Sequence, residues 1–295
     1  MKYLKNHQQY TFNHLIFLPI YLALILVSLV NGIYLISSDS VTQLAYINIY
    51  GFKPGIPIVS SLFEVLLYSV GGFQLLAVLI LFYSLLTGEF KLNKPKTFLK
   101  WGLLSVIISV LIHGYIVRVI SNHPASAGLF FYLVILYIVL AYTESVENKA
   151  SKDTFYDKIK LLPIYIGVFY TMGFPGWQKI LNGDVVVGKY IMMFKDSFLA
   201  QLPGGIKPFI YFLGILELTV PIILLISFVR GEFLLRRPAI WLKGALFLSM
   251  LTFIFLCFGL SILVVFQGAT NLLFYSLFTL VLYIYVDWNS LKPIS

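Results

Sequence analysis

Long apolar segments alternate with short polar connections along the whole chain. A bilayer core about 30 Å thick is crossed by about 20 mainly apolar residues in a helix. The pattern predicts an all-α polytopic membrane protein with an uncleaved first anchor, because the first segment runs well beyond the apolar region of a signal sequence. Eight transmembrane helices are predicted, over residues 15–38, 61–86, 101–120, 126–143, 161–181, 207–229, 244–266 and 270–287.

The composition agrees with a membrane location, and the distribution of charged residues predicts the topology. Of 295 residues, 60% are hydrophobic and only 11% are charged, whereas a soluble domain carries about 25% charged residues. If all eight segments cross, 15 of the 21 Lys and Arg residues lie in connections on one side. Positive charge collects on the cytoplasmic side, so we expect an inner-membrane protein with both termini cytoplasmic. The net charge of +9 then reports topology and contact with membrane lipids, and no nucleic-acid partner is expected.

The two halves of the chain resemble each other. Shifting the sequence by 143 positions aligns residues 88–103 with residues 231–246, and eight of these sixteen positions are identical. Matches in polar connections are more informative than shared Leu or Ile in apolar helices. We therefore predict two parallel four-helix repeats, residues 1–148 and residues 149–295, related by an axis along the membrane normal.

The long connection at residues 184–205 has an amphipathic pattern. Val187, Ile191, Phe194 and Phe198 fall on one helical face. Two interpretations stay open: a helix lying on the membrane surface, or a lid packed on the helical bundle.

Glu217, near the middle of a predicted span, is the first candidate for a functional residue. Ionisable groups inside apolar spans are costly and often mark functional sites. The first half has Gln74 at the equivalent position, so one repeat carries a carboxyl group and the other its neutral isostere. A buried Glu217 would suit proton transfer or hydrogen bonding to a quinone or lipid headgroup. Alternatively, a protonated Glu217 joins helices by hydrogen bonds.

Three further polar residues lie towards the predicted outer face. Glu64 opens the second span, while His113 and Arg118 lie near the end of the third. Residues five apart do not share one helical face, so a common pocket would require packing between helices. The alternatives are a satisfied core histidine and an arginine that extends to the headgroups.

Several chemistries are not expected. A single cysteine, Cys257, cannot form an intramolecular disulfide or a thiolate metal site. Only His113 among the four histidines lies inside a span, so haem ligation and metal binding by this chain are not predicted. The sequence has no phosphate-binding loop. No catalytic residue is predicted.

The stretch from Gly173 to Leu246 resembles the DoxX-type membrane protein family. It has a Gly-x-x-Lys motif at Gly176 to Lys179, which encloses Trp177 and Gln178. It also has Gly-x-x-Glu at Gly214 to Glu217 and a basic turn before the next span. The first half is similar to a diverged copy without these charges.

This resemblance implies a four-helix unit used in quinone-linked or redox-associated complexes, including thiosulfate:quinone oxidoreductase subunits. It implies quinone as a cofactor, periplasmic or membrane redox proteins as partners, and a site at Glu217, Lys179, Gln74, Trp177 and Gln178. Similarity to the duplicated MauE proteins would imply thiol chemistry, which a single cysteine supports poorly. The expected function is a membrane subunit of a redox or envelope complex. The alternative is a small-solute or lipid transporter with its site between the repeats.

Overall fold

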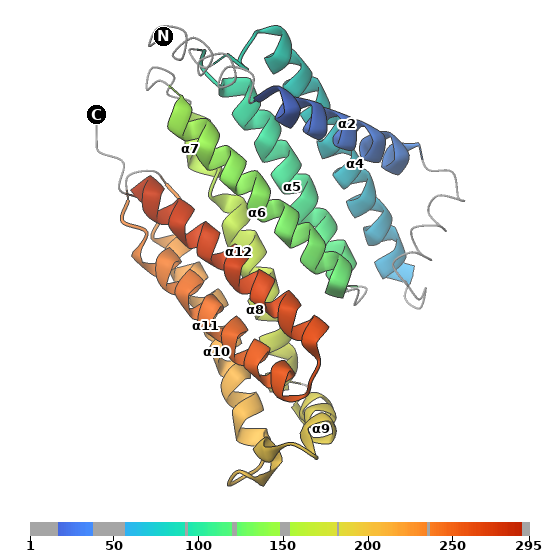
Figure 1. Cartoon of the computed structure of the whole chain (residues 1–295), viewed down its shortest axis with the longest axis vertical. Helices are drawn as coiled ribbons and strands as arrows, with labels where there is room; N and C mark the ends of the chain where they lie inside the picture. The colour runs from blue at the N-terminus through green and yellow to red at the C-terminus, as the bar shows by residue number, and fades with distance from the viewer. Residues whose placement is uncertain are drawn as a thin grey trace, which may run out of the picture. The chain divides into compact units, whose positions relative to one another are not determined.

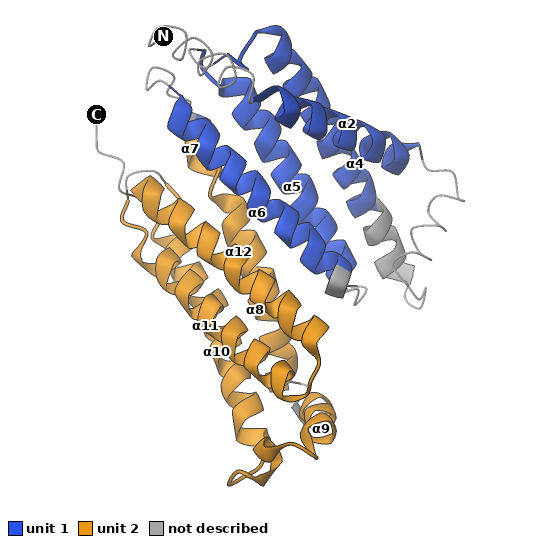
Figure 2. Ribbon diagram, viewed as in Figure 1, with its two compact units in different colours: residues 1–156 blue, residues 157–295 orange. Residues whose placement is uncertain are grey.

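The chain divides into two compact helical units (Figure 2). A computed structural model describes residues 17–37, 57–91, 94–119, 123–147, 154–181, 183–234 and 237–290. Unit 1 covers residues 1–156 and unit 2 covers residues 157–295. This boundary falls eight residues after the predicted repeat boundary at residue 148. The described residues of both units are helices joined by turns, without strands.

Unit 1 packs its helices in chain order. Helix α2 contacts α4, α4 contacts α5, and α5 contacts α6. The α4–α5 contact is close, because a Cβ added at Gly102 would lie 2.6 Å from the Leu81 side chain. Ser105 adds a hydrogen bond from its hydroxyl to the Phe73 carbonyl (2.8 Å). The helices are α2 (Phe17–Ile36), α4 (Pro57–Leu86), α5 (Thr97–Val119) and α6 (His123–Val146). The short α7 (Thr154–Ile159) includes the boundary between the two units.

Unit 2 has the same order of long helices with an added crosswise segment (Figure 1). Helix α8 packs on α10, α10 on α11, and α11 on α12, while α9 contacts both α8 and α10. The elements are α8 (Leu162–Leu181), α9 (Gly183–Phe194), the 3₁₀ turn η1 (Phe198–Gln201), α10 (Lys207–Val229), α11 (Ile240–Ile262) and α12 (Phe266–Ser290).

Seven of these helices are long and apolar enough to cross a membrane: α2, α4, α5, α6, α10, α11 and α12. This confirms a polytopic helical protein of the membrane type. The remaining predicted span, residues 161–181, also forms a helix, α8. This helix is not among the seven that are apolar enough to cross a membrane. Its 20 residues include three glycines, two prolines, Gln178 and Lys179. The structure thus shows seven candidate spans among the described residues, where the sequence predicted eight.

Helices α5 and α11 begin about one turn before the predicted spans. The predicted spans start at residues 101 and 244 and so leave Lys100 and Lys243 in the connections. Each lysine instead forms an ion pair with a carboxylate near the end of the last long helix of its unit. Lys100 Nζ lies 2.7 Å from Glu147 Oε2, and Lys243 Nζ lies 2.8 Å from Asp287 Oδ1. Pairing lets both charges sit inside the first helical turns.

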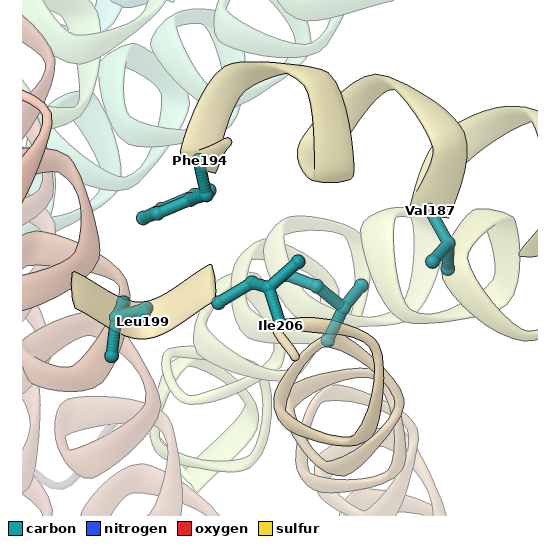
Figure 3. Packing of buried hydrophobic residues seen from close by; sticks show 5 residues of the cluster. Val187, Phe194, Leu199 and Ile206 are labelled. Atoms are coloured by element: carbon teal, nitrogen blue, oxygen red, sulfur yellow. The ribbon is translucent and has the colours of Figure 1, made fainter. Parts of the chain in front are cut away.

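The predicted amphipathic face over residues 184–205 is divided in the structure. Val187 and Phe194 are buried with Leu199 and Ile206 in one apolar cluster (Figure 3). Ile191 and Phe198, expected on the same face, are exposed. The helix ends at Phe194 and gives way to a turn before η1, so one helical periodicity does not extend to Phe198.

Candidate functional site

A buried ion pair joins α8 to α10 in unit 2. Lys179 Nζ lies 2.6 Å from both carboxylate oxygens of Glu217. Only 5% of the lysine side chain and 2% of the glutamate side chain are exposed. The two charged residues of the Gly-x-x-Lys and Gly-x-x-Glu motifs are thus direct partners. Such a pair recovers part of the desolvation cost of its two charges through its geometry and its charge-assisted hydrogen bonds.

The glycines of the two motifs make this contact possible. A Cβ added at Gly176 would lie 2.8 Å from the Glu217 Cβ, and one added at Gly214 would lie 3.1 Å from the Lys179 Cβ. Each glycine therefore faces the stem of the charged residue on the opposite helix. Residues three apart share a helical face. The Gly-x-x-charge spacing therefore places a glycine, which leaves room for the opposite helix, next to a charged residue. The two motifs interlock across the crossing.

Two prolines flank the ion pair. Pro175 lies inside α8 and Pro221 lies inside α10. Proline has no backbone N–H, so Pro221 cannot donate the helical hydrogen bond that the Glu217 carbonyl would accept. A Cβ added at Gly173 would lie 3.1 Å from the Pro221 Cγ, so this proline also packs closely on α8. The crossing thus brings a backbone carbonyl, a carboxylate and an ammonium group into one apolar region.

Unit 1 forms the same crossing without charges. A Cβ added at Gly71 would lie 3.0 Å from the Leu35 Cβ, which repeats the approach of Gly214 to Lys179. Leu35 therefore takes the place of the lysine, and Gln74 takes the place of the glutamate. Both are buried, and the Gln74 Oε1 atom has no hydrogen-bond partner within the described part of the chain. Sequence comparison missed Leu35 because the first helix is offset by 144 residues rather than 143.

A separate polar network, in unit 1, fixes the turn between α4 and α5. The Ser84 hydroxyl donates to Glu89 Oε2 (2.6 Å) and also contacts the Tyr21 hydroxyl (2.6 Å). The same carboxylate accepts hydrogen bonds from the backbone N–H groups of Phe98 (3.1 Å) and Leu99 (2.8 Å). These N–H groups lie in the first turn of α5, where they lack helical acceptors and favour a negative charge.

Unit 2 repeats this network residue for residue. Ser227 donates to Glu232 Oε2 (2.8 Å) and contacts the Tyr165 hydroxyl (2.7 Å). Glu232 accepts from the backbone N–H groups of Trp241 (3.2 Å) and Leu242 (2.9 Å). The repeated Gly-Glu-Phe motif was recognised in the sequence only as evidence of duplication. Its structural role is that of a carboxylate that caps the next helix from across a turn.

The other predicted site residues are not gathered at the ion pair. Trp177 is 58% exposed and Gln178 is partly buried, although both neighbour Lys179 in sequence. His113 and Arg118 lie on α5, five residues apart and partly buried. The side chain of Glu64 lies outside the described residues, so the predicted outer-face pocket stays a prediction.

Neither metal chemistry nor a known relative is indicated by the remaining observations. No group of three His, Cys, Asp or Glu side chains suited to a metal ion occurs within the described segments. Comparisons with protein-family models, with curated proteins and with solved structures find no match for this chain. The resemblance to DoxX-type proteins, which rests on the two interlocking motifs and the basic turn, stays a prediction.

Proposed function

We propose that the protein crosses the inner membrane eight times, with both termini cytoplasmic and with two parallel four-helix repeats. Pairing of Lys179 with Glu217 supports α8 as the eighth span, because a paired charge is less costly in the membrane than a lone one. The repeated carboxylate caps at Glu89 and Glu232 support the duplication. Parallel repeats place these two turns, with their neighbouring Lys and Arg residues, on the cytoplasmic side.

We further propose that the protein is a DoxX-like, non-catalytic membrane subunit of a redox or envelope complex, and that Lys179 and Glu217 form its quinone- or lipid-binding site. One observation carries this proposal. Unit 1 makes a similar glycine-packed crossing, in which Gly71 faces Leu35 and Gly32 faces Leu75, so the charges are not required for the packing. Because burying an ion pair is often no more stabilising than neutral packing, the pair in unit 2 has a role beyond holding α8 against α10.

The chemistry of the pair suits a quinone or a lipid headgroup. The Lys179 ammonium can donate a hydrogen bond to a quinone carbonyl or a headgroup phosphate, and Glu217 can accept one from a quinol hydroxyl. Exposed Trp177 on the neighbouring position offers an aromatic surface at the lipid side of α8. The chain binds and orients the quinone in this proposal, while electron transfer belongs to partner proteins.

The experiment is purification in mild detergent, followed by quinone and lipid analysis and identification of associated proteins. The wild type is compared with the double variant Lys179→Leu/Glu217→Gln, which copies unit 1. The matched control is Lys243→Leu/Asp287→Asn, which removes an ion pair at the end of the bundle. We expect a bound quinone or a specific lipid, lost only from the first variant. Equal retention in all three proteins would refute the proposed site.

A second function is favoured by the prolines. Helices α8 and α10 each contain an internal proline, Pro175 and Pro221, and so resemble the Pro-interrupted helices that line transporter sites at membrane depth. In a small-solute or lipid transporter, Glu217 would be the coupling group. Purified protein alone in liposomes would then move its substrate, whereas a subunit of a redox complex would copurify with redox partners and show no transport.

A further inference from the structure

The segment between α8 and α10 has apolar side chains on two opposite sides. Its inner side contributes Val187 and Phe194 to a cluster with Leu199, Ile206 and Ile210, all at most 6% exposed (Figure 3). This side fastens α9 to the bundle. Val187 and Phe194, which belong to the predicted amphipathic face, are therefore covered by the protein itself.

The outer side of α9 is apolar as well. Met192 is 75% exposed, Val185 is 66% exposed and Met193 is 50% exposed. Ile191, inside the helix, and Phe198, after its end, are also about half exposed. A contiguous apolar surface of this kind marks an interaction site.

The position of α9 indicates what covers this surface. The helix runs across the direction of α10, at the end of unit 2 where α10 begins (Figure 1). Helix α10 is a candidate membrane span, and its outward side chains Phe212 and Ile215 are about half exposed. An apolar surface at the end of a span lies at the depth where hydrocarbon meets headgroups.

The charges next to this surface match that depth. Lys189 lies on the outer side of α9, Lys195 follows the helix, and Lys207 opens α10; all three are exposed. Lysine stems lie along apolar surface while their ammonium groups reach the headgroup phosphates. Asp196, next to Lys195, is 89% exposed and lies 3.8 Å from its ammonium group. A lipid interface accommodates this combination of apolar residues and lysines.

We propose that α9 is an interfacial anchor: its inner side is fixed to unit 2, and Val185, Met192 and Met193 enter the headgroup boundary of the bilayer. This inference rests on the proposal that α10 crosses the membrane. It combines the two interpretations of the sequence, because α9 is packed on the bundle and also faces lipid. The anchor holds α10 at a defined depth and so fixes the depth of Glu217 two to three turns away.

The test uses a single fluorophore in proteoliposomes of phosphatidylcholine and phosphatidylglycerol. In a Cys257→Ala background, an environment-sensitive label is attached to Met192→Cys. Two matched positions are Asp196→Cys, in the same segment, and Ile222→Cys, on the outward side of α10. All three sites are exposed, so the substitutions leave the core unchanged. Quenching is measured with aqueous iodide and with lipids carrying a nitroxide near the headgroup or near the chain end.

The expected result is a loss of fluorescence at position 192 with the shallow nitroxide lipid and little loss with iodide, while position 196 shows the reverse. Strong iodide quenching at 192 would overturn the proposal. Protection of 192 from both quenchers would also overturn it, because protein would then cover the surface. Position 222 separates the two proposals: quenching by the deep nitroxide lipid supports the membrane span even if 192 fails, and its absence refutes the span itself.

Discussion

The sharpest stability prediction concerns the two halves of the Lys179–Glu217 pair. Lys179→Leu leaves a buried carboxyl group and Glu217→Gln leaves a buried ammonium group, whereas the double substitution copies the neutral crossing of unit 1. Breaking a buried pair by removing one partner costs about 3–5 kcal/mol, and replacing both partners with well-packed neutral groups is often near neutral. We therefore expect each single variant to lose about 3 kcal/mol and the double variant to lose about 1 kcal/mol or less.

The assay is reversible unfolding in mixed micelles of a mild detergent and dodecyl sulfate, followed by circular dichroism. The wild type and the three variants form a double-mutant cycle, which isolates the coupling between the two side chains. Additive losses, or single variants each costing less than about 1 kcal/mol, would refute the reasoning.

Two further substitutions test the packing and the caps. Gly176→Ala places a Cβ 2.8 Å from the Glu217 Cβ and should lower the free energy of unfolding by about 1–3 kcal/mol. In the control Gly244→Ala, the added Cβ meets nothing within 4 Å. This variant should be neutral or more stable by up to about 1 kcal/mol in the same unfolding assay. Glu232→Ala leaves two backbone N–H groups of α11 without their acceptor and should cost about 2–4 kcal/mol. Thermal unfolding checks this, with the 89% exposed Asp196→Ala as a control expected to change little; equal losses in both variants would contradict the capping role.

Much of the helical framework could be predicted from the sequence because apolar length is a strong signal. The seven helices suited to membrane crossing all overlap predicted spans. The helix starts were placed too late where a charge is paired. Lys100 and Lys243 are compatible with α5 and α11 only because of Glu147 and Asp287, which lie more than 40 residues away in sequence.

The candidate site was predictable only in part for a similar reason. Glu217 and Lys179 could each be singled out, but their contact depends on the crossing of α8 and α10, which the Gly-x-x spacing does not by itself reveal. Leu35 was missed because one residue of difference in the first connection shifts its alignment with Lys179. The caps formed by Glu89 and Glu232 were visible as a repeated motif, although nothing in the sequence pairs a loop carboxylate with N–H groups nine and ten residues later.

The central claim is that the ion pair of unit 2 binds a lipid-soluble ligand and that the neutral crossing of unit 1 does not. The most direct test is photolabelling of the purified protein with an azido-ubiquinone, followed by peptide mapping with unlabelled ubiquinone as competitor. Labelling should concentrate on the α8 and α10 peptides that contain Lys179 and Glu217, and it should disappear in Lys179→Leu/Glu217→Gln. Equal labelling of the double variant, or labelling of the α2 and α4 peptides that contain Leu35 and Gln74 to the same extent, would contradict the claim.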